Sequence, residues 1–200
     1  MNLPNKLTVL RMCLVPVIVL VLMLPVNMAT NIIGAFIFLA TAITDILDGR
    51  IARKNGLITD FGKFLDPLAD KFMTLSAMMC IMYRVYLYKQ DSDIKVIFAI
   101  FMPLVMITVF RELAVASIRL ITAKNANIVV AANILGKVKT VSQIVCVMAA
   151  LLEPVIARID FFFLSYYPIT IAASVVSLVM TVWSGIFYIT KYWKYMDKNK

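Results

Sequence analysis

Histidine is absent from the 200-residue chain, and cysteine occurs only three times. Cys13, Cys80 and Cys146 stand singly in apolar stretches, without metal-ligand spacing and without an obvious disulfide partner. These absences argue against a zinc site, and the cysteines are expected to pack as small apolar residues. Charged residues are scarce, at 16% of the chain, and no internal repeat is visible, which weighs against an inverted-repeat transporter.

Hydrophobic residues make up 62% of the sequence, and the mean hydropathy is +0.92. Most apolar runs approach or exceed the roughly 20 residues that a helix needs to span a bilayer. We predict an all-α polytopic membrane protein, a single domain over residues 1–200, in which six transmembrane helices follow a short interfacial helix over 1–11. The expected spans are 12–26, 29–50, 62–88, 95–121, 127–152 and 163–190. No small-residue cleavage site follows the first apolar stretch, so we expect it to stay attached.

Six spans place both termini on the same side of the membrane. Of the 20 Lys and Arg residues, all fall on this side except Arg84, Lys89, Lys95 and Arg158. The positive-inside rule makes it the cytoplasmic side of a cell membrane, inner or plasma. Orientation and attraction to anionic headgroups account for the net charge of +9, and nucleic-acid binding is not expected because no binding module accompanies the charge. An aromatic belt is predicted at the same depth, formed by Tyr188, Tyr192, Trp193 and Tyr195.

Four aspartates lie close together in this charge-poor chain, in the runs Asp45-Ile-Leu-Asp48-Gly49-Arg50-Ile-Ala52-Arg53 and Gly62-Lys63-Phe-Leu-Asp66-Pro67-Leu-Ala-Asp70. The first pair is three residues apart and the second pair four, so each pair projects from one face of a helix. Acids near a membrane point to function, and four bare carboxylates would repel one another. Oxygen-only ligands favour Mg²⁺ or Mn²⁺, and two ions fit the charge better than one.

The residues around the aspartates suit a phosphate-bearing ligand. Bound Mg²⁺ usually completes its shell with phosphate oxygens and water. Gly49 and Gly62 allow the backbone to approach a ligand closely, while Arg53 and Lys63 add positive charge for a diphosphate. Together these residues suggest metal-assisted phosphoryl transfer at the membrane surface.

Other interpretations of the aspartates lead away from catalysis. They could cap helices and pair with neighbouring basic residues, or the chain could be a catalytically silent scaffold, which the presence of all four disfavours. A cation- or proton-coupled transporter would need acids at mid-membrane, whereas these lie at predicted helix ends.

The pattern Asp-x2-Asp-Gly-x2-Ala-Arg-x8-Gly-x3-Asp-x3-Asp resembles the signature of the CDP-alcohol phosphotransferase family, and every position is filled at family spacing. The six-helix architecture of that family agrees with the hydropathy pattern. Further stretches, at residues 2–11, 62–71, 111–119 and 136–140, are similar to its phosphatidylglycerophosphate synthase branch. The resemblance covers about residues 1 to 145, and the last helix matches only in hydropathy.

The resemblance implies transfer of the phosphatidyl group of CDP-diacylglycerol to sn-glycerol 3-phosphate, with release of CMP. It implies that Asp45, Asp48 and Asp66 are the main metal ligands and that Asp70 completes the cluster and acts as general base. The implied cytidine-diphosphate pocket comprises Gly49, Ala52, Arg53, Gly62 and Lys63, with Thr8 closing it from the N-terminal helix. Because members of the family commonly form homodimers, a homodimer is expected.

A phosphorylated acceptor needs a cationic pocket of its own. Arg111 and Arg119 are eight residues apart, about 80° around a helix and roughly 12 Å along it, so both could border one cavity. Lys137 and Lys139 differ by about 200° around the next helix, so we expect only one to point inward, with Lys137 the first candidate and Lys139 the second. The alternative is a local pair of Arg111 with Glu112, with Arg119 reaching toward headgroups. Inositol phosphate, serine or phosphatidylglycerol remain possible acceptors, and free serine ranks low.

Overall fold

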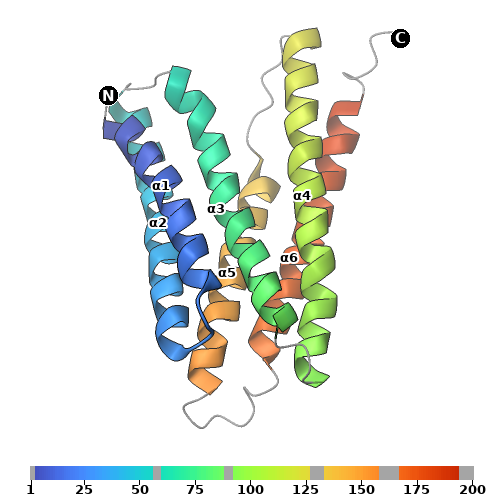
Figure 1. Ribbon diagram of the computed structural model, residues 1–200. Coiled ribbons are helices and arrows are strands. Elements are labelled where there is room, and N and C mark those ends of the chain that lie inside the picture. The colour runs from blue at the N-terminus through green and yellow to red at the C-terminus, as the bar shows by residue number, and fades with distance from the viewer. Residues whose placement is uncertain (1–2, 56–59, 88–91, 127–132, 158–166, 194–200) are drawn as a thin grey trace.

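The computed structural model describes residues 3–55, 60–87, 92–126, 133–157 and 167–193 (Figure 1). Within these ranges, the side chains of 3–7, 45–55, 60–68, 92–94, 120 and 123–126 lie outside the described part. The described residues form six α-helices and no strand. The helices are α1 (Leu3–Met23), α2 (Met28–Asn55), α3 (Asp60–Leu87), α4 (Ser92–Ala126), α5 (Ile134–Ala157) and α6 (Pro168–Tyr192).

Long apolar helices dominate the fold. Three described segments are long and apolar enough to cross a membrane, and they are Lys95–Arg119, Ile134–Ala157 and Pro168–Tyr192. Thr8–Met23 and Met28–Thr44 form shorter apolar helical stretches. The predicted fold class, an all-α polytopic membrane protein, is confirmed.

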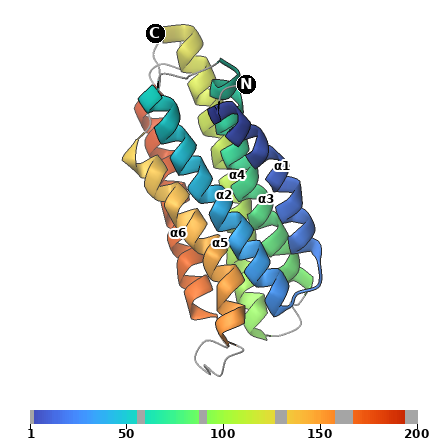
Figure 2. The same ribbon diagram turned by 90° about the vertical axis from the view of Figure 1, so that its left-hand side faces the viewer.

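The six helices form an up-and-down bundle. The first residues of α1, α3 and α5 and the last residues of α2, α4 and α6 lie at one end, which is the upper end in Figure 1. On one side of the bundle α1 packs against α2 and α3, and on the other α6 packs against α4 and α5. Contacts of α2 with α5 and of α3 with α4 join the two sides (Figure 2). Both signature-bearing stretches therefore lie at the same end of the bundle.

The predicted starts of the first and fifth helices differ from the structure. The expected interfacial helix over 1–11 is not separate, because α1 runs without a break from Leu3 to Met23, and Thr8 and Arg11 in its first half are buried. Pro4 stands in the first turn of α1, where a proline is tolerated, and α1 also accommodates Pro16. The fifth helix begins at Ile134 rather than near 127. Its first turn closes on the carbonyl of Asn133, a residue type favoured at helix N-termini.

The end of the bundle opposite the signature is held by local polar contacts. Asn27 and Thr30 cap the start of α2 reciprocally: the Asn27 Oδ1 accepts the Thr30 N–H at 2.8 Å, and the Thr30 Oγ1 accepts the Asn27 N–H at 3.1 Å. Arg84 of α3 donates to the same Oγ1 at 3.0 Å. Nearby, α1 and α2 approach so closely that a Cβ on Gly34 would lie 2.7 Å from the Leu22 Cδ2.

The buried face of α6 is lined with small hydroxyl residues. Two of these hydroxyls donate to carbonyls of the preceding turn, Ser174 to Thr170 and Thr181 to Ser177, both at 2.7 Å. Small side chains let helices pack closely in a membrane protein. The stripe comprises Thr170, Ser174, Ser177, Thr181 and Ser184, and it leads along α6 toward Tyr188 and the site described next.

Candidate active site

A cavity of about 380 Å³ lies between α3, α4, α5 and α6, and Ala42 of α2 also lines it. Its ionisable lining includes five basic side chains and two carboxylates among the described residues. The surplus of positive charge in a helical membrane protein points to an anionic ligand. These side chains are Lys71, Arg111, Arg119, Lys137 and Lys139, together with Asp70 and Glu112.

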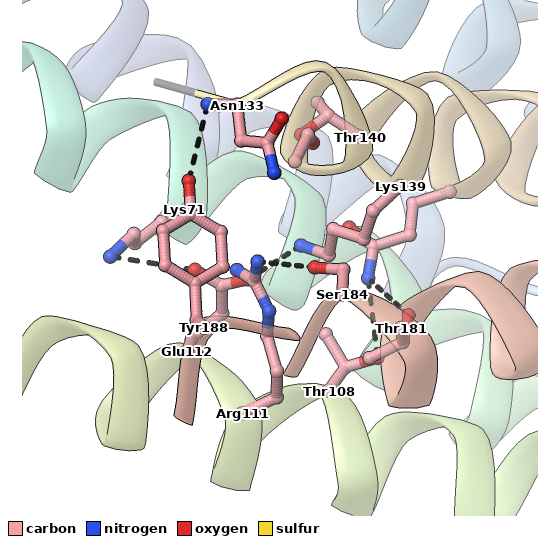
Figure 3. A network of polar contacts seen from close by, with 12 residues as sticks. Lys71, Thr108, Arg111, Glu112, Asn133, Lys139, Thr140, Thr181, Ser184 and Tyr188 are labelled. Atoms are coloured by element: carbon pink, nitrogen blue, oxygen red, sulfur yellow. Dashed lines mark hydrogen bonds and ion pairs between the residues drawn. The ribbon is translucent and has the colours of Figure 1, made fainter. Parts of the chain in front are cut away.

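Glu112 is the centre of an ion-pair network that joins three helices (Figure 3). Its Oε1 lies 2.6 Å from the Lys139 Nζ and 2.8 Å from an Arg111 guanidinium nitrogen, and its Oε2 lies 3.4 Å from the Lys71 Nζ. Glu112 is only 6% exposed, so a carboxylate there needs such partners. Because one carboxylate serves three cations, the network keeps a positive excess toward the cavity.

The wall behind Arg111 is made by hydrogen-bonding side chains of α4, α5 and α6. Arg111 donates to the Ser184 Oγ, and its Nε is buried without an acceptor among the described atoms. The Gln143 amide donates to the Thr108 Oγ1 at 3.2 Å and lies 3.5 Å from the Thr181 Oγ1. An unmatched buried donor destabilises a site, and a ligand oxygen in the cavity would supply the missing acceptor.

The two lysines of α5 both line the cavity, but they differ in burial. Lys139 is buried and reaches Glu112, whereas Lys137 is exposed. The inward-pointing lysine is thus Lys139, not the first candidate Lys137. A long flexible side chain in the first turn of a helix, such as that of Lys137, can border an opening beside it.

Arg111 also takes part in the local pair with Glu112 that the sequence offered as an alternative. That pair does not remove Arg111 from the cavity, which it lines together with Arg119. Arg119 is exposed and lies over the ring of Tyr188. All four predicted acceptor-phosphate residues therefore border one cavity.

The predicted aromatic belt is only partly an exposed belt. Trp193 is 64% exposed, but Tyr188 and Tyr192 are buried, at 2% and 7%, and Tyr195 lies outside the described residues. Tyr188 lines the cavity beside the arginines. Residue type and position alone predict an interfacial Tyr188, because its contacts with α4 and α5 leave no signal in the neighbouring sequence.

Of the four signature aspartates, only Asp70 has a described side chain, and it is half-buried and lines the cavity. No cluster of three potential metal-binding side chains occurs among the residues that the structure describes. The remaining signature candidates lie in the helical backbone of α2 and α3, with side chains outside the described part. They are Asp45, Asp48, Gly49, Ala52, Arg53, Gly62, Lys63 and Asp66.

Thr8 is buried in α1 and is not among the residues that line the cavity. Lys71 and Gln143 also line the cavity, and neither is among the site residues expected from the sequence. Lys71 follows Asp70 directly, and this adjacency was the available signal. Gln143 stands in an apolar run, and the sequence around it does not mark it as a site residue. Its role is visible only from its partners, Thr108 on α4 and Thr181 on α6.

Comparison with known proteins places this sequence in a family. The sequence model of the CDP-alcohol phosphatidyltransferase family matches residues 1–184. A Bacillus subtilis protein is 35% identical over 96% of both chains, and a Shigella flexneri protein is 32% identical over 94% of this chain and 93% of its own. A Rickettsia felis protein is 37% identical over 71% of this chain and 70% of its own. Each bears the name CDP-diacylglycerol–glycerol-3-phosphate 3-phosphatidyltransferase. The chain therefore belongs to the CDP-alcohol phosphatidyltransferase family and is a membrane-bound enzyme of that class.

Proposed function

We propose that the enzyme transfers the phosphatidyl group of CDP-diacylglycerol to sn-glycerol 3-phosphate, giving phosphatidylglycerophosphate and CMP. The main support is the cavity in which Asp70 meets five basic side chains. Relatives that align over nearly the whole chain are named for this reaction. The proposal therefore joins a local feature of this molecule to a relationship that covers its full length.

The basic side chains suit an acceptor that carries its own phosphate. In the cavity, five cations face two carboxylates, so the described lining has a formal charge of +3. A phosphate monoester has a charge of about −2 near neutral pH, and guanidinium groups bind its oxygens through paired hydrogen bonds. Arg111, Arg119 and Lys137 would hold the acceptor phosphate, with Lys139 adding charge from its ion pair with Glu112. Free serine lacks a group that needs these cations.

Asp70 would act as the general base. It would take the proton of the acceptor hydroxyl while that oxygen forms a bond to the lipid-side phosphorus of the donor. The bond from that phosphorus to the bridging oxygen would break, and CMP would leave with the electron pair. Because the acceptor attacks phosphorus directly, the reaction needs no covalent intermediate on the enzyme.

Divalent ions fit the donor set of this site. The family is generally dependent on divalent metal. The chain has no histidine, and its cysteines occur singly at residues 13, 80 and 146, so Asp45, Asp48, Asp66 and Asp70 offer oxygen ligands only. That set suits Mg²⁺ or Mn²⁺, and we propose two ions. When bound, they would neutralise the donor diphosphate and stabilise the departing CMP.

The donor nucleotide would lie beside the signature. We propose that the cytidine-diphosphate pocket is formed by Gly49, Ala52, Arg53, Gly62 and Lys63, with Thr8 of α1 at its edge. The surplus of basic residues at this end of the bundle supports a cytoplasmic active site and cytoplasmic termini in the cell membrane. A homodimer is proposed from family resemblance, and light scattering of the detergent-solubilised enzyme would test it.

The test is CMP release from CDP-diacylglycerol by the detergent-solubilised enzyme with Mg²⁺ or Mn²⁺. Glycerol 3-phosphate, inositol phosphate, serine and phosphatidylglycerol are offered singly as acceptors. We expect turnover with glycerol 3-phosphate and its loss on chelation of the metal. Turnover with another acceptor but not with glycerol 3-phosphate would overturn the acceptor assignment while leaving the reaction class intact.

A further inference from the structure

Tyr188 of α6 contacts both cavity arginines through one ring. The Cζ atom of Arg111 lies 5.4 Å from the ring centroid, and the Cζ atom of Arg119 lies 5.7 Å from it. Both distances are within the roughly 6 Å range of cation–π attraction, which is strongest where water is excluded. Tyr188 is 2% exposed, so the ring offers these cations a largely desolvated surface.

The ring is itself held in place by α5. The Tyr188 hydroxyl accepts the backbone N–H of Asn133 at 3.3 Å, at the start of that helix (Figure 3). A Cβ on Gly136, in the first turn of α5, would lie 3.6 Å from the same hydroxyl, so the two helices are in close contact here. A change of χ1 that swung the whole side chain away from the arginines would break this hydrogen bond.

The preceding turn of α6 also holds Arg111. The Ser184 Oγ accepts a guanidinium hydrogen, and Gly185 leaves room for the arginine stem, since a Cβ there would lie 3.1 Å from the Arg111 Cγ. Ser184, Gly185 and Tyr188 thus contact Arg111 along its length. Gly185 and Tyr188 lie beyond residue 184, where the match to the family model ends.

We propose that Tyr188 is a positioning residue that holds Arg111 and Arg119 as a pair for the phosphate of the acceptor. This inference rests on the proposed function and deepens it, because it assigns acceptor specificity partly to the last turns of α6. Tyr188 would act through the arginines without touching the reacting atoms. The donor depends on residues of α2 and α3, so its affinity should not depend on this ring.

The test compares KM values for the two substrates in Tyr188→Phe and Tyr188→Leu. The Phe variant keeps the aromatic face, and we expect its KM for glycerol 3-phosphate within about threefold of the wild-type value, since only the hydroxyl is lost. The Leu variant loses both cation–π contacts, and we expect that KM to rise on the order of tenfold to thirtyfold. The KM for CDP-diacylglycerol should change less than about twofold in both variants, since neither contact involves the donor.

Controls separate positioning from general loss of structure. Tyr192→Leu removes a neighbouring buried ring that stacks on Tyr188 at 6.1 Å but does not line the cavity, and it should affect the two KM values equally. If Tyr188→Leu is not recovered as folded protein, Tyr188→Met replaces it, because Met is similar in volume to Leu and also lacks an aromatic ring. Equal shifts for both substrates, or a Phe variant no better than Leu, would overturn the inference. Failure to recover both the Leu and Met variants as folded protein would also overturn it, because it would show a role in folding.

The wild-type assay distinguishes the two levels of the proposal. If the wild-type enzyme releases no CMP with glycerol 3-phosphate, the proposed function fails whatever Tyr188 does. If wild-type turnover is normal and Tyr188→Leu shows no selective rise in the acceptor KM, only the positioning role fails.

Discussion

Glu112 in α4 and Glu153 in α5 are both buried acids in a membrane protein, but their partners differ. The two Glu153 oxygens accept backbone N–H groups of Ile169 and Thr170 at 2.8 and 2.6 Å, at the start of α6. Glu112 instead binds three basic side chains from three helices. Glu153 therefore acts as a cap for a helix N-terminus, with its acceptors occupied by fixed donors. Glu112 leaves a surplus of positive charge beside a cavity, as a binding site for an anion requires.

The contrast teaches that burial alone does not identify a functional acid. Both carboxylates are nearly inaccessible, at 6% and 1% exposure. What separates them is whether the partners are backbone groups that complete a helix or charged side chains that also face a cavity. Changes at the cavity should alter catalysis, and changes at Glu153 should alter stability alone.

The largest effect is expected for Asp70→Asn, which keeps the size of the cavity side chain but removes the proposed base. We predict that kcat falls on the order of 10²- to 10⁴-fold, the usual contribution of general-base catalysis. Initial-rate measurements of CMP release at saturating acceptor would measure it. The melting temperature of the solubilised protein should remain near the wild-type value, and normal turnover by a folded Asn variant would refute the assignment.

Glu112→Gln should reduce both stability and acceptor binding. Loss of the carboxylate leaves the Lys139 ammonium buried without its counter-ion, and breaking a buried ion pair in this way costs about 3–5 kcal/mol. Thermal unfolding and the KM for glycerol 3-phosphate would be measured together. Glu112→Asp keeps the negative charge, so it should retain more of the thermal stability and more of the affinity for glycerol 3-phosphate than Glu112→Gln. A Gln variant with wild-type stability and wild-type KM would show that the network is dispensable.

Much of the architecture follows from the sequence, for physical reasons that particular residues illustrate. Apolar run length predicts six helices, and the described residues form six, of which three are long and apolar enough to cross a membrane. Helical periodicity placed Arg111 and Arg119 near one face, and both line the cavity with Lys137 and Lys139. The metal and nucleotide roles of the signature stay predictions, because apart from Asp70 and Thr8 the side chains concerned lie outside the described part.

The parts that the sequence did not predict depend on contacts between distant segments. Lys139 forms an ion pair with Glu112, which lies 27 residues away in the sequence, and Arg111 donates a hydrogen bond to Ser184, which lies 73 residues away. Nothing local to Tyr188 distinguishes a cavity tyrosine from one at the membrane interface. Such contacts are decided by how α4, α5 and α6 pack, and this packing uses small hydroxyl residues with little hydropathy signal of their own.

Glu153→Gln tests the structural side of the comparison. An amide oxygen can accept one of the two backbone N–H groups, but the amide nitrogen would face the other donor. We predict a loss of about 1–3 kcal/mol in unfolding free energy, from one unmatched donor and a weaker interaction with the helix dipole. Thermal unfolding in detergent should show a lower melting temperature. Both KM values should stay unchanged, and a selective rise in the acceptor KM would mean that this end of the bundle is coupled to the site.

The smallest effect, and the finest test of the contrast, comes from two glycines. At Gly185 an added Cβ lies 3.1 Å from the stem of Arg111, whose head is bound to Glu112 and Ser184, so Gly185→Ala must displace the stem slightly. We expect a two- to fivefold rise in the acceptor KM, about 0.4–1 kcal/mol, with little change in stability.

Gly34→Ala places a Cβ 2.7 Å from Leu22, far from the cavity lining, and should lower the melting temperature without altering either KM. Both KM values and the melting temperature would be measured for the two variants side by side. If both variants changed the acceptor KM and the melting temperature in the same way, the cavity end of the bundle could not be distinguished from the opposite end by function.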